Sequence, residues 1–211
     1  MREIADRFEY LLHLPSRDGP WPLLLYLHGI AEARDQRPES DAPVPLSAVK
    51  KNGAPPFQCD PNNPGGCPAL VDRFAVLSPQ LRRRGPWEPD LGLVGSLLRE
   101  VITRHPVDSN RLFVTGFSIG GTAAVELVQR ERLRFAKWIA VDAHRDPPGW
   151  TRGAAGQIPH LLINGPMGIA SRSDRTRVIQ CSELGHAETA QAAYGGRLFI
   201  EGQNIYDWLL A

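Results

Sequence analysis

A serine flanked by glycines is the first residue whose type and spacing can do chemistry. Ser118 lies at the centre of the pentapeptide GFSIG, a G-x-S-x-G pattern at residues 116–120. The run RLFVT before it is typical of a buried strand, and the run TAAVELVQR after it is typical of a helix. A serine on such a tight turn projects its hydroxyl clear of a sheet. Gly116 and Gly120 leave room for the crossing backbone, so we predict Ser118 as a nucleophile.

A histidine late in the chain is the predicted general base. His186 follows a predicted strand and precedes the terminal helix, and the order serine then histidine is the one described for this motif. The other five histidines fit structural positions in strands, at helix ends and in loops, although His144 follows a strand and can also reach the site. We expect His28 to order its own loop.

Two backbone amides are the predicted donors to a developing oxyanion. The run LLLYLHG at residues 23–29 reads as a buried strand that ends in His28 and Gly29. The loop after it can present the N–H of Ile30 beside the N–H of Ile119, which begins the helix behind the serine. Two such donors make an oxyanion hole, and the helix N-terminus also favours negative charge.

The surrounding pattern predicts one α/β domain over residues 1–211, with a mostly parallel sheet flanked by helices. Predicted strands are Phe8–Leu14, Leu23–His28, Phe74–Ser78, Leu112–Gly116, Lys137–Asp142, His160–Asn164 and Arg177–Ser182. Predicted helices are Leu91–His105 with Asp90 as its cap, Ile119–Arg130 and Gly202–Leu210. The link over residues 31–73 is long, with only Leu46–Lys51 helix-like, and is expected to wall a site. Residues 143–159 are too few for a lid domain.

Composition narrows the class of protein. The chain has 211 residues with 24 basic and 23 acidic side chains, which gives a formal net charge of +1. A charge so near zero argues against a protein whose main role is to bind nucleic acid or an anionic membrane surface. No apolar run approaches the roughly 20 residues of a membrane span, and no signal peptide is visible, so a cytoplasmic location is expected.

Cys59 and Cys67 bracket a short loop and can pair across it. No Cys/His set has zinc-site spacing, so neither a metal nor a cofactor is expected. No pattern specifies an oligomeric state.

These features together resemble the α/β-hydrolase superfamily. The resemblance covers the chain from about Phe8 to Leu210 and rests on LLLYLHG, FAVLSPQ, VDSNRLFVTGFSIGG, LGHAE and YDWLL. More narrowly it resembles the small bacterial esterases of the phospholipase/carboxylesterase type and their depolymerase-like relatives. It implies a serine hydrolase that works through an acyl-enzyme, with Ser118 as nucleophile and His186 as base.

The sequence departs from this family where the triad acid is expected. The family places an aspartate just after the strand that here is His160–Asn164, but Gly168 stands at that position. Asp174 comes next, yet it precedes a strand of a parallel sheet and so starts about 20 Å from the active edge. Glu183 is near His186 but is better placed to shape the loop. Asp142 ends a strand at the active edge and is the preferred acid, with Asp174 as the alternative.

The substrate prediction is a small-molecule ester reaching an open site. Trp87 is expected to line the pocket, together with residues of the Pro55–Pro68 stretch, and Arg82 follows a strand at the same edge, where it can attract an anionic group. Two other functions remain open. The acyl group can pass to an acceptor other than water in a biosynthetic pathway, including a thioesterase step, or the scaffold can bind ligand without catalysis.

Overall fold

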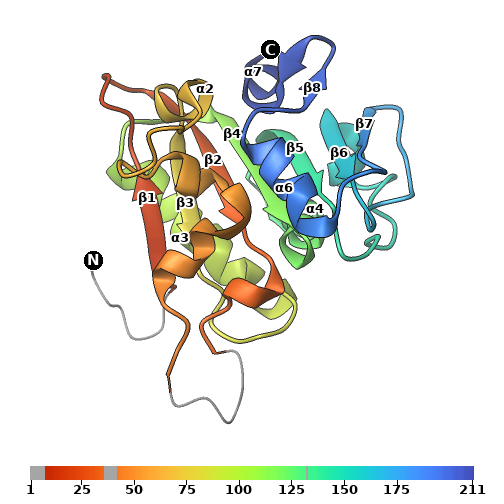
Figure 1. Cartoon of the computed structure of the whole chain (residues 1–211), viewed down its shortest axis with the longest axis horizontal. Coiled ribbons are helices and arrows are strands. Elements are labelled where there is room, and N and C mark those ends of the chain that lie inside the picture. Colours follow the sequence, from red (N-terminus) through yellow and green to blue (C-terminus); the bar gives the residue numbers. More distant parts are fainter. Residues whose placement is uncertain (1–7, 36–41, 132) are drawn as a thin grey trace.

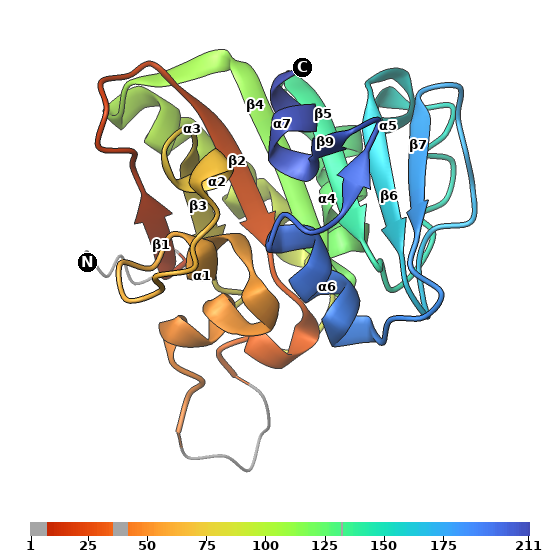
Figure 2. The same ribbon diagram turned by 45° about the horizontal axis from the view of Figure 1, so that its top comes forward.

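The computed structural model describes residues 8–35, 42–131 and 133–211. A seven-stranded sheet in the order β1-β3-β2-β4-β5-β6-β7 runs through the molecule, with β1 antiparallel and every other pairing parallel (Figures 1 and 2). The strands are β1 (Tyr10–His13), β2 (Trp21–Leu27), β3 (Ala75–Pro79), β4 (Val107–Phe117), β5 (Phe135–Val141), β6 (His160–Asn164) and β7 (Thr176–Gln180). The sequence prediction of a mostly parallel α/β sheet is confirmed.

Helices cover both faces of the sheet, which explains why the central strands are continuous apolar runs. One core contains Leu23, Leu25 and Leu27 of β2 together with apolar residues of α3 (Leu91–Arg104) and α4 (Ile119–Arg130). The opposite core contains Leu24 and Tyr26 with residues of α6 (His186–Tyr194) and α7 (Ile205–Leu210). Successive side chains of β2 thus alternate between the two cores, as strand geometry requires.

The predicted strands and long helices all form, with shifts of a few residues at most ends. Ile119–Arg130 and His160–Asn164 have the predicted bounds, whereas β4 begins at Val107, five residues earlier than expected. The predicted helix Gly202–Leu210 is shorter, because Gln203–Asn204 (β9) pairs with Phe199–Ile200 (β8) before α7 begins.

Several elements were missed. Helix α6 is the most important of these, because it begins at His186 itself. In the long link after β2, the predicted helix-like segment Leu46–Lys51 forms as η2 (Leu46–Gly53). The turns that were not predicted are η1 (Ile30–Glu32), α1 (Pro55–Gln58) and α2 (Pro68–Val71) in this link and η3 (Glu88–Asp90) after β3.

The link from β5 to β6 contains only one short helix, α5 (Ala154–Gln157), so no lid domain covers the sheet within the described ranges. In the same ranges, no helix has the length and apolar character that crossing a membrane requires.

Candidate active site

Ser118 occupies a strained turn between β4 and α4. Its backbone angles are φ 57° and ψ −120°, a conformation that costs a non-glycine residue about 1–3 kcal/mol and persists only where the surroundings hold it. The surroundings do so here: the Ser118 N–H donates to Val141 O at 3.0 Å, and Ser118 O accepts from the N–H of His144 at 3.0 Å. These bonds tie the turn to β5 and to the residues after it.

Two glycines are required for this turn, as the sequence predicted. A Cβ on Gly116 would lie 2.0 Å from the Gly120 carbonyl oxygen, and a Cβ on Gly120 would lie 1.9 Å from the Leu27 carbonyl oxygen. Both contacts are with backbone, which cannot move aside as a flexible side chain can. The turn therefore packs directly against the end of β2, where the predicted oxyanion loop begins.

His186 lies next to the serine turn and is bonded to Asp142. The His186 Nδ1 and Asp142 Oδ2 atoms are 2.5 Å apart, and the imidazole packs against the ring of Phe117, with centroids 4.4 Å apart and the ring planes tilted by 33°. Phe117 directly precedes Ser118, so the ring packing brings the imidazole to the turn. With Nδ1 held by a carboxylate, Nε2 is the atom left to accept a proton.

Asp142 directly follows β5 and is fully buried. Backbone N–H groups of the loop after β6 donate to its carboxylate. Its Oδ1 accepts from the N–H of Gly165 at 2.8 Å and from the N–H of Met167 at 2.9 Å. Its own backbone has φ 41°, and its N–H donates to Ile163 O at 2.6 Å. The other carboxylate oxygen is thereby aimed at His186. Gly165 must be glycine, because a Cβ there would lie 2.4 Å from Thr189 Oγ1.

The other candidate acids lie elsewhere. Asp174 precedes Thr176, which pairs with His160 at the start of β6, so it stands at the opposite edge of the sheet. Glu183 is exposed in the loop before α6. Gly168, where the family resemblance places an aspartate, has φ +128°, and a Cβ there would lie 2.4 Å from the Asn164 side chain. The segment after β6 thus supplies amide donors to the carboxylate of Asp142, which directly follows β5.

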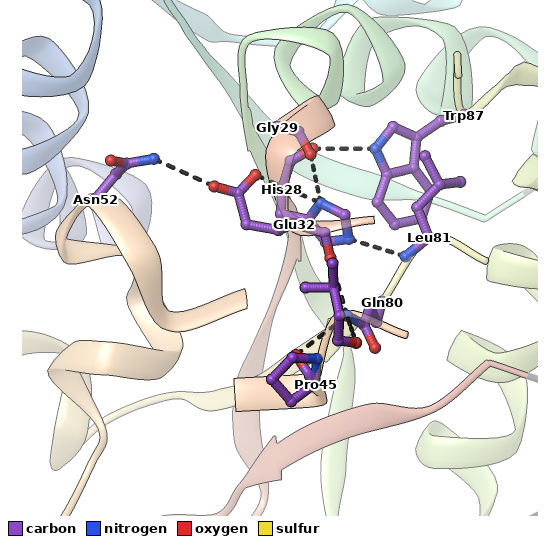
Figure 3. Close-up of polar contacts among 9 residues, drawn as sticks. His28, Gly29, Glu32, Pro45, Asn52, Gln80, Leu81 and Trp87 are labelled. Carbon is purple, nitrogen blue, oxygen red and sulfur yellow. Dashed lines mark hydrogen bonds and ion pairs between the residues drawn. The ribbon is translucent and has the colours of Figure 1, made fainter. Parts of the chain in front are cut away.

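Hydrogen bonds of His28 hold in place the loop that carries Ile30. The Leu81 N–H donates to His28 Nε2 at 2.8 Å, so the ring proton lies on Nδ1, which donates to Gly29 O at 2.6 Å. The Trp87 indole N–H donates to His28 O at 3.1 Å, and Figure 3 shows the imidazole enclosed among these partners. Burial lowers the pKa of His28 to about 4, which keeps the ring neutral. As expected, this histidine orders its own loop.

Glu32 is a buried acid near the site that sequence reasoning missed. It ends η1 and is 3% exposed, and its Oε1 accepts from the Asn52 amide at 3.4 Å (Figure 3). Burial raises the pKa of its carboxyl, while the charges of Lys51 and His186 act in the opposite direction. No motif marks this residue, because a single glutamate in a polar loop normally faces solvent.

A cavity of about 390 Å³ opens beside the serine turn. Ile30 and Ile119 both line it, and so do Trp87 and His144. Charged side chains complete its wall, among them Arg145, whose guanidinium donates to Glu126 Oε1 at 2.7 Å. The predicted oxyanion donors and the predicted substrate contact Trp87 therefore share one cavity.

Arg82 is not among the residues that line this cavity. Its Nη2 donates to Asp90 Oδ1 at 2.5 Å, and its guanidinium lies over the Phe8 ring at 5.9 Å. The same bond corrects the prediction for Asp90, whose side chain makes no capping bond to α3 because it accepts from Arg82 instead. The Arg82 side chain is still 43% exposed, so its contact with an anionic substrate group stays a prediction.

The three cysteines are free thiols, with Cys59 and Cys67 half-buried and Cys181 buried. Burial raises the pKa of Cys59 to about 12, so this thiol is a poor nucleophile. Among the residues that the structure describes, no group of three or more His, Cys, Asp or Glu is arranged to hold a metal ion.

No family model and no curated protein matches this sequence. Solved structures do match it. A thermostable esterase superposes with a TM-score of 0.69 at 18% identity over 95% of this chain, and a 2,6-dihydroxy-pseudo-oxynicotine hydrolase with 0.58 at 13% over 95%. A phospholipase/carboxylesterase from Dyadobacter fermentans DSM 18053 gives 0.51 at 15%, over 85% of this chain and 89% of that one.

The chain spans 58% of the length of the thermostable esterase and 63% of the length of the hydrolase. These likenesses, together with the sheet order and the serine turn, establish that the chain has the α/β-hydrolase fold. The fold expected from the sequence resemblance is confirmed.

Proposed function

We propose that this chain is a serine esterase that cleaves a small-molecule carboxylic ester through an acyl-enzyme. The observation that carries the proposal is the 2.5 Å contact between Asp142 Oδ2 and His186 Nδ1, on an imidazole that packs against the residue before Ser118. A hydroxyl on a strained turn, an imidazole and a buried carboxylate are the three groups that acyl transfer to serine requires.

Each group has a distinct task in the proposed reaction. Ser118 Oγ attacks the ester carbonyl while His186 Nε2 takes its proton, and the resulting imidazolium is stabilised by Asp142. The backbone N–H groups of Ile30 and Ile119 hold the oxyanion. His186 then returns the proton to the leaving alcohol, and a water molecule deacylates the serine by the same steps in reverse.

The cavity beside Ser118 is the proposed site for the acyl portion. Its apolar side is formed by Ile30, Trp87 and Ile119, and at about 390 Å³ it holds a small acyl group. The absence of a lid between β5 and β6, within the described ranges, fits substrates that approach from solvent.

Turnover of 4-nitrophenyl acetate tests the proposal. Ser118→Ala should lower kcat by more than about 1,000-fold, because the acyl-enzyme cannot form. Ser96→Ala is a matched control, since Ser96 is an exposed serine on α3 whose hydroxyl bonds only within its own helix turn and to Arg99. Equal activity in wild type and Ser118→Ala would contradict the proposal.

Acyl transfer to an acceptor other than water would use the same acyl-enzyme, and product analysis with competing alcohols or amines distinguishes it from hydrolysis. The binding-only alternative is motivated by the missing aspartate after β6 and by the short crossover that follows. The contact between Asp142 and His186 favours catalysis over that alternative.

A further inference from the structure

A second and larger cavity lies between η2, the loop after α1 and the C-terminal part of α6. Its volume is about 550 Å³, and it shares no lining residue with the cavity of Ile30 and Ile119. Figure 2 shows the orange η2 segment lying beside α6. Three cationic residues line it, namely Lys50, Lys51 and Arg197. None of the described lining residues is acidic. The chain has only three lysines, so two of them are here.

Two of these three cations form no ion pair with a described residue, although the charge of Lys51 also acts on the buried carboxyl of Glu32. Lys50 Nζ donates to Asp60 Oδ2 at 2.5 Å, which neutralises it. Lys51 and Arg197 are exposed, and neither forms an ion pair with any residue in the described part of the chain. Two unpaired cations facing one cavity favour a bound anion, and the planar guanidinium of Arg197 suits a carboxylate or phosphate.

The cavity is adjacent to the proposed catalytic base. Gln191 lines it from α6, the helix that begins at His186, although its side chain leaves the helix about 140° around the axis from that of His186. From the η2 side, Asn52 lines the cavity and donates to Glu32. Glu32 in turn lies near Phe117, because a Cβ on Gly29 would lie 3.1 Å from Glu32 Oε2 and 3.3 Å from the Phe117 ring, which packs against His186. Asn52 and Glu32 therefore lie between this cavity and the pair formed by Phe117 and His186.

We infer that this cavity binds an anionic group on the alcohol portion of the ester, held by Lys51 and Arg197. The inference rests on the proposed function, because a base that returns its proton to the leaving oxygen lies on the alcohol side of the scissile bond. The acyl portion then occupies the cavity of Ile30 and Ile119. The substrate class is an ester whose alcohol carries a carboxylate or a comparable anion.

Two esters of the same shape test the inference: 4-carboxyphenyl acetate, which is anionic, and 4-carbamoylphenyl acetate, which is neutral. The quantity measured is the ratio of kcat/KM for the two esters at low ionic strength. The double variant Lys51→Gln/Arg197→Gln should lower this ratio about tenfold, because charge-assisted hydrogen bonds are lost, partly discounted for solvent exposure. Added salt should lower the wild-type ratio in the same direction.

Arg152→Gln/Arg175→Gln is the matched control. Both residues are exposed and lie outside the cavity, and the variant changes the net charge by the same two units. A ratio that falls only in the Lys51/Arg197 variant supports the inference, whereas a ratio that stays unchanged there, or falls equally in the control, overturns it. Failure of the wild type to hydrolyse either ester or 4-nitrophenyl acetate would overturn the proposed function itself.

Discussion

Replacing Asp142 by asparagine separates the chemistry of this carboxylate from its role in the fold. The side-chain oxygen of the new asparagine can still accept from the N–H groups of Gly165 and Met167, which lie 2.8 and 2.9 Å from Asp142 Oδ1. Its amide nitrogen would then face His186 Nδ1 and donate to it. The imidazole must therefore carry its proton on Nε2, where it can no longer accept the proton of Ser118.

The expected cost is large for activity and small for stability. A reversed tautomer lowers kcat by about 10⁴-fold in enzymes with this arrangement, which is about 5 kcal/mol of transition-state stabilisation. Asp142→Ala should lose a similar activity but also leave the amides of Gly165 and Met167 without a partner. At about 1–3 kcal/mol for each unsatisfied donor, the alanine variant should lose about 2–6 kcal/mol of unfolding free energy.

Steady-state turnover of 4-nitrophenyl acetate and urea unfolding of the same preparations measure both effects. Asp174→Asn is the control, because Asp174 is exposed and lies at the opposite edge of the sheet. The reasoning is refuted if Asp142→Asn retains activity within tenfold of the wild type, or if Asp174→Asn loses activity instead.

Two further predictions concern the framework of the site. Gly120→Ala should destabilise the chain by more than about 3 kcal/mol in urea unfolding, since the added Cβ would lie 1.9 Å from a backbone oxygen; Gly92→Ala on α3, where a Cβ meets nothing within 4 Å, should cost little. His28 has a pKa lowered to about 4 by burial, so the unfolded chain takes up a proton that the folded chain does not, and folding weakens as the pH falls below about 6.5. The difference in unfolding free energy between wild type and His28→Gln should therefore narrow by about 2 kcal/mol from pH 7 to pH 5, and a constant difference would contradict the neutral assignment.

The serine turn could be predicted from the sequence because its determinants are contiguous. A strand, two glycines around Ser118 and a helix all lie within about twenty residues, and the local sequence of each segment predicts its own structure. Helix α6 was missed although its sequence, HAETAQAAY, is rich in alanine, which favours helices. It has no clear stripe of large apolar residues, and it begins after Gly185 without a side-chain cap. Packing against the sheet, rather than a local signal, places it.

The partners of Asp142 could not be predicted in the same way. Its side chain is oriented by amides of Gly165 and Met167, which are more than twenty residues away, and by its own positive φ. Position alone could favour Asp142 over Asp174, because parallel strands bring their carboxyl ends to one edge. Glu32 and the Arg82–Asp90 pair depend on contacts between loops, for which the sequence carries no periodic pattern.

Covalent labelling by a fluorophosphonate tests the central claim most directly, because only a hydroxyl activated by a neighbouring base reacts rapidly with this probe. Intact-mass measurement should show one adduct per chain, and peptide mapping should place it on Ser118. Ser118→Ala should take up none, and His186→Ala should react far more slowly. A wild-type chain that stays unlabelled, or one modified at another residue, would contradict the account.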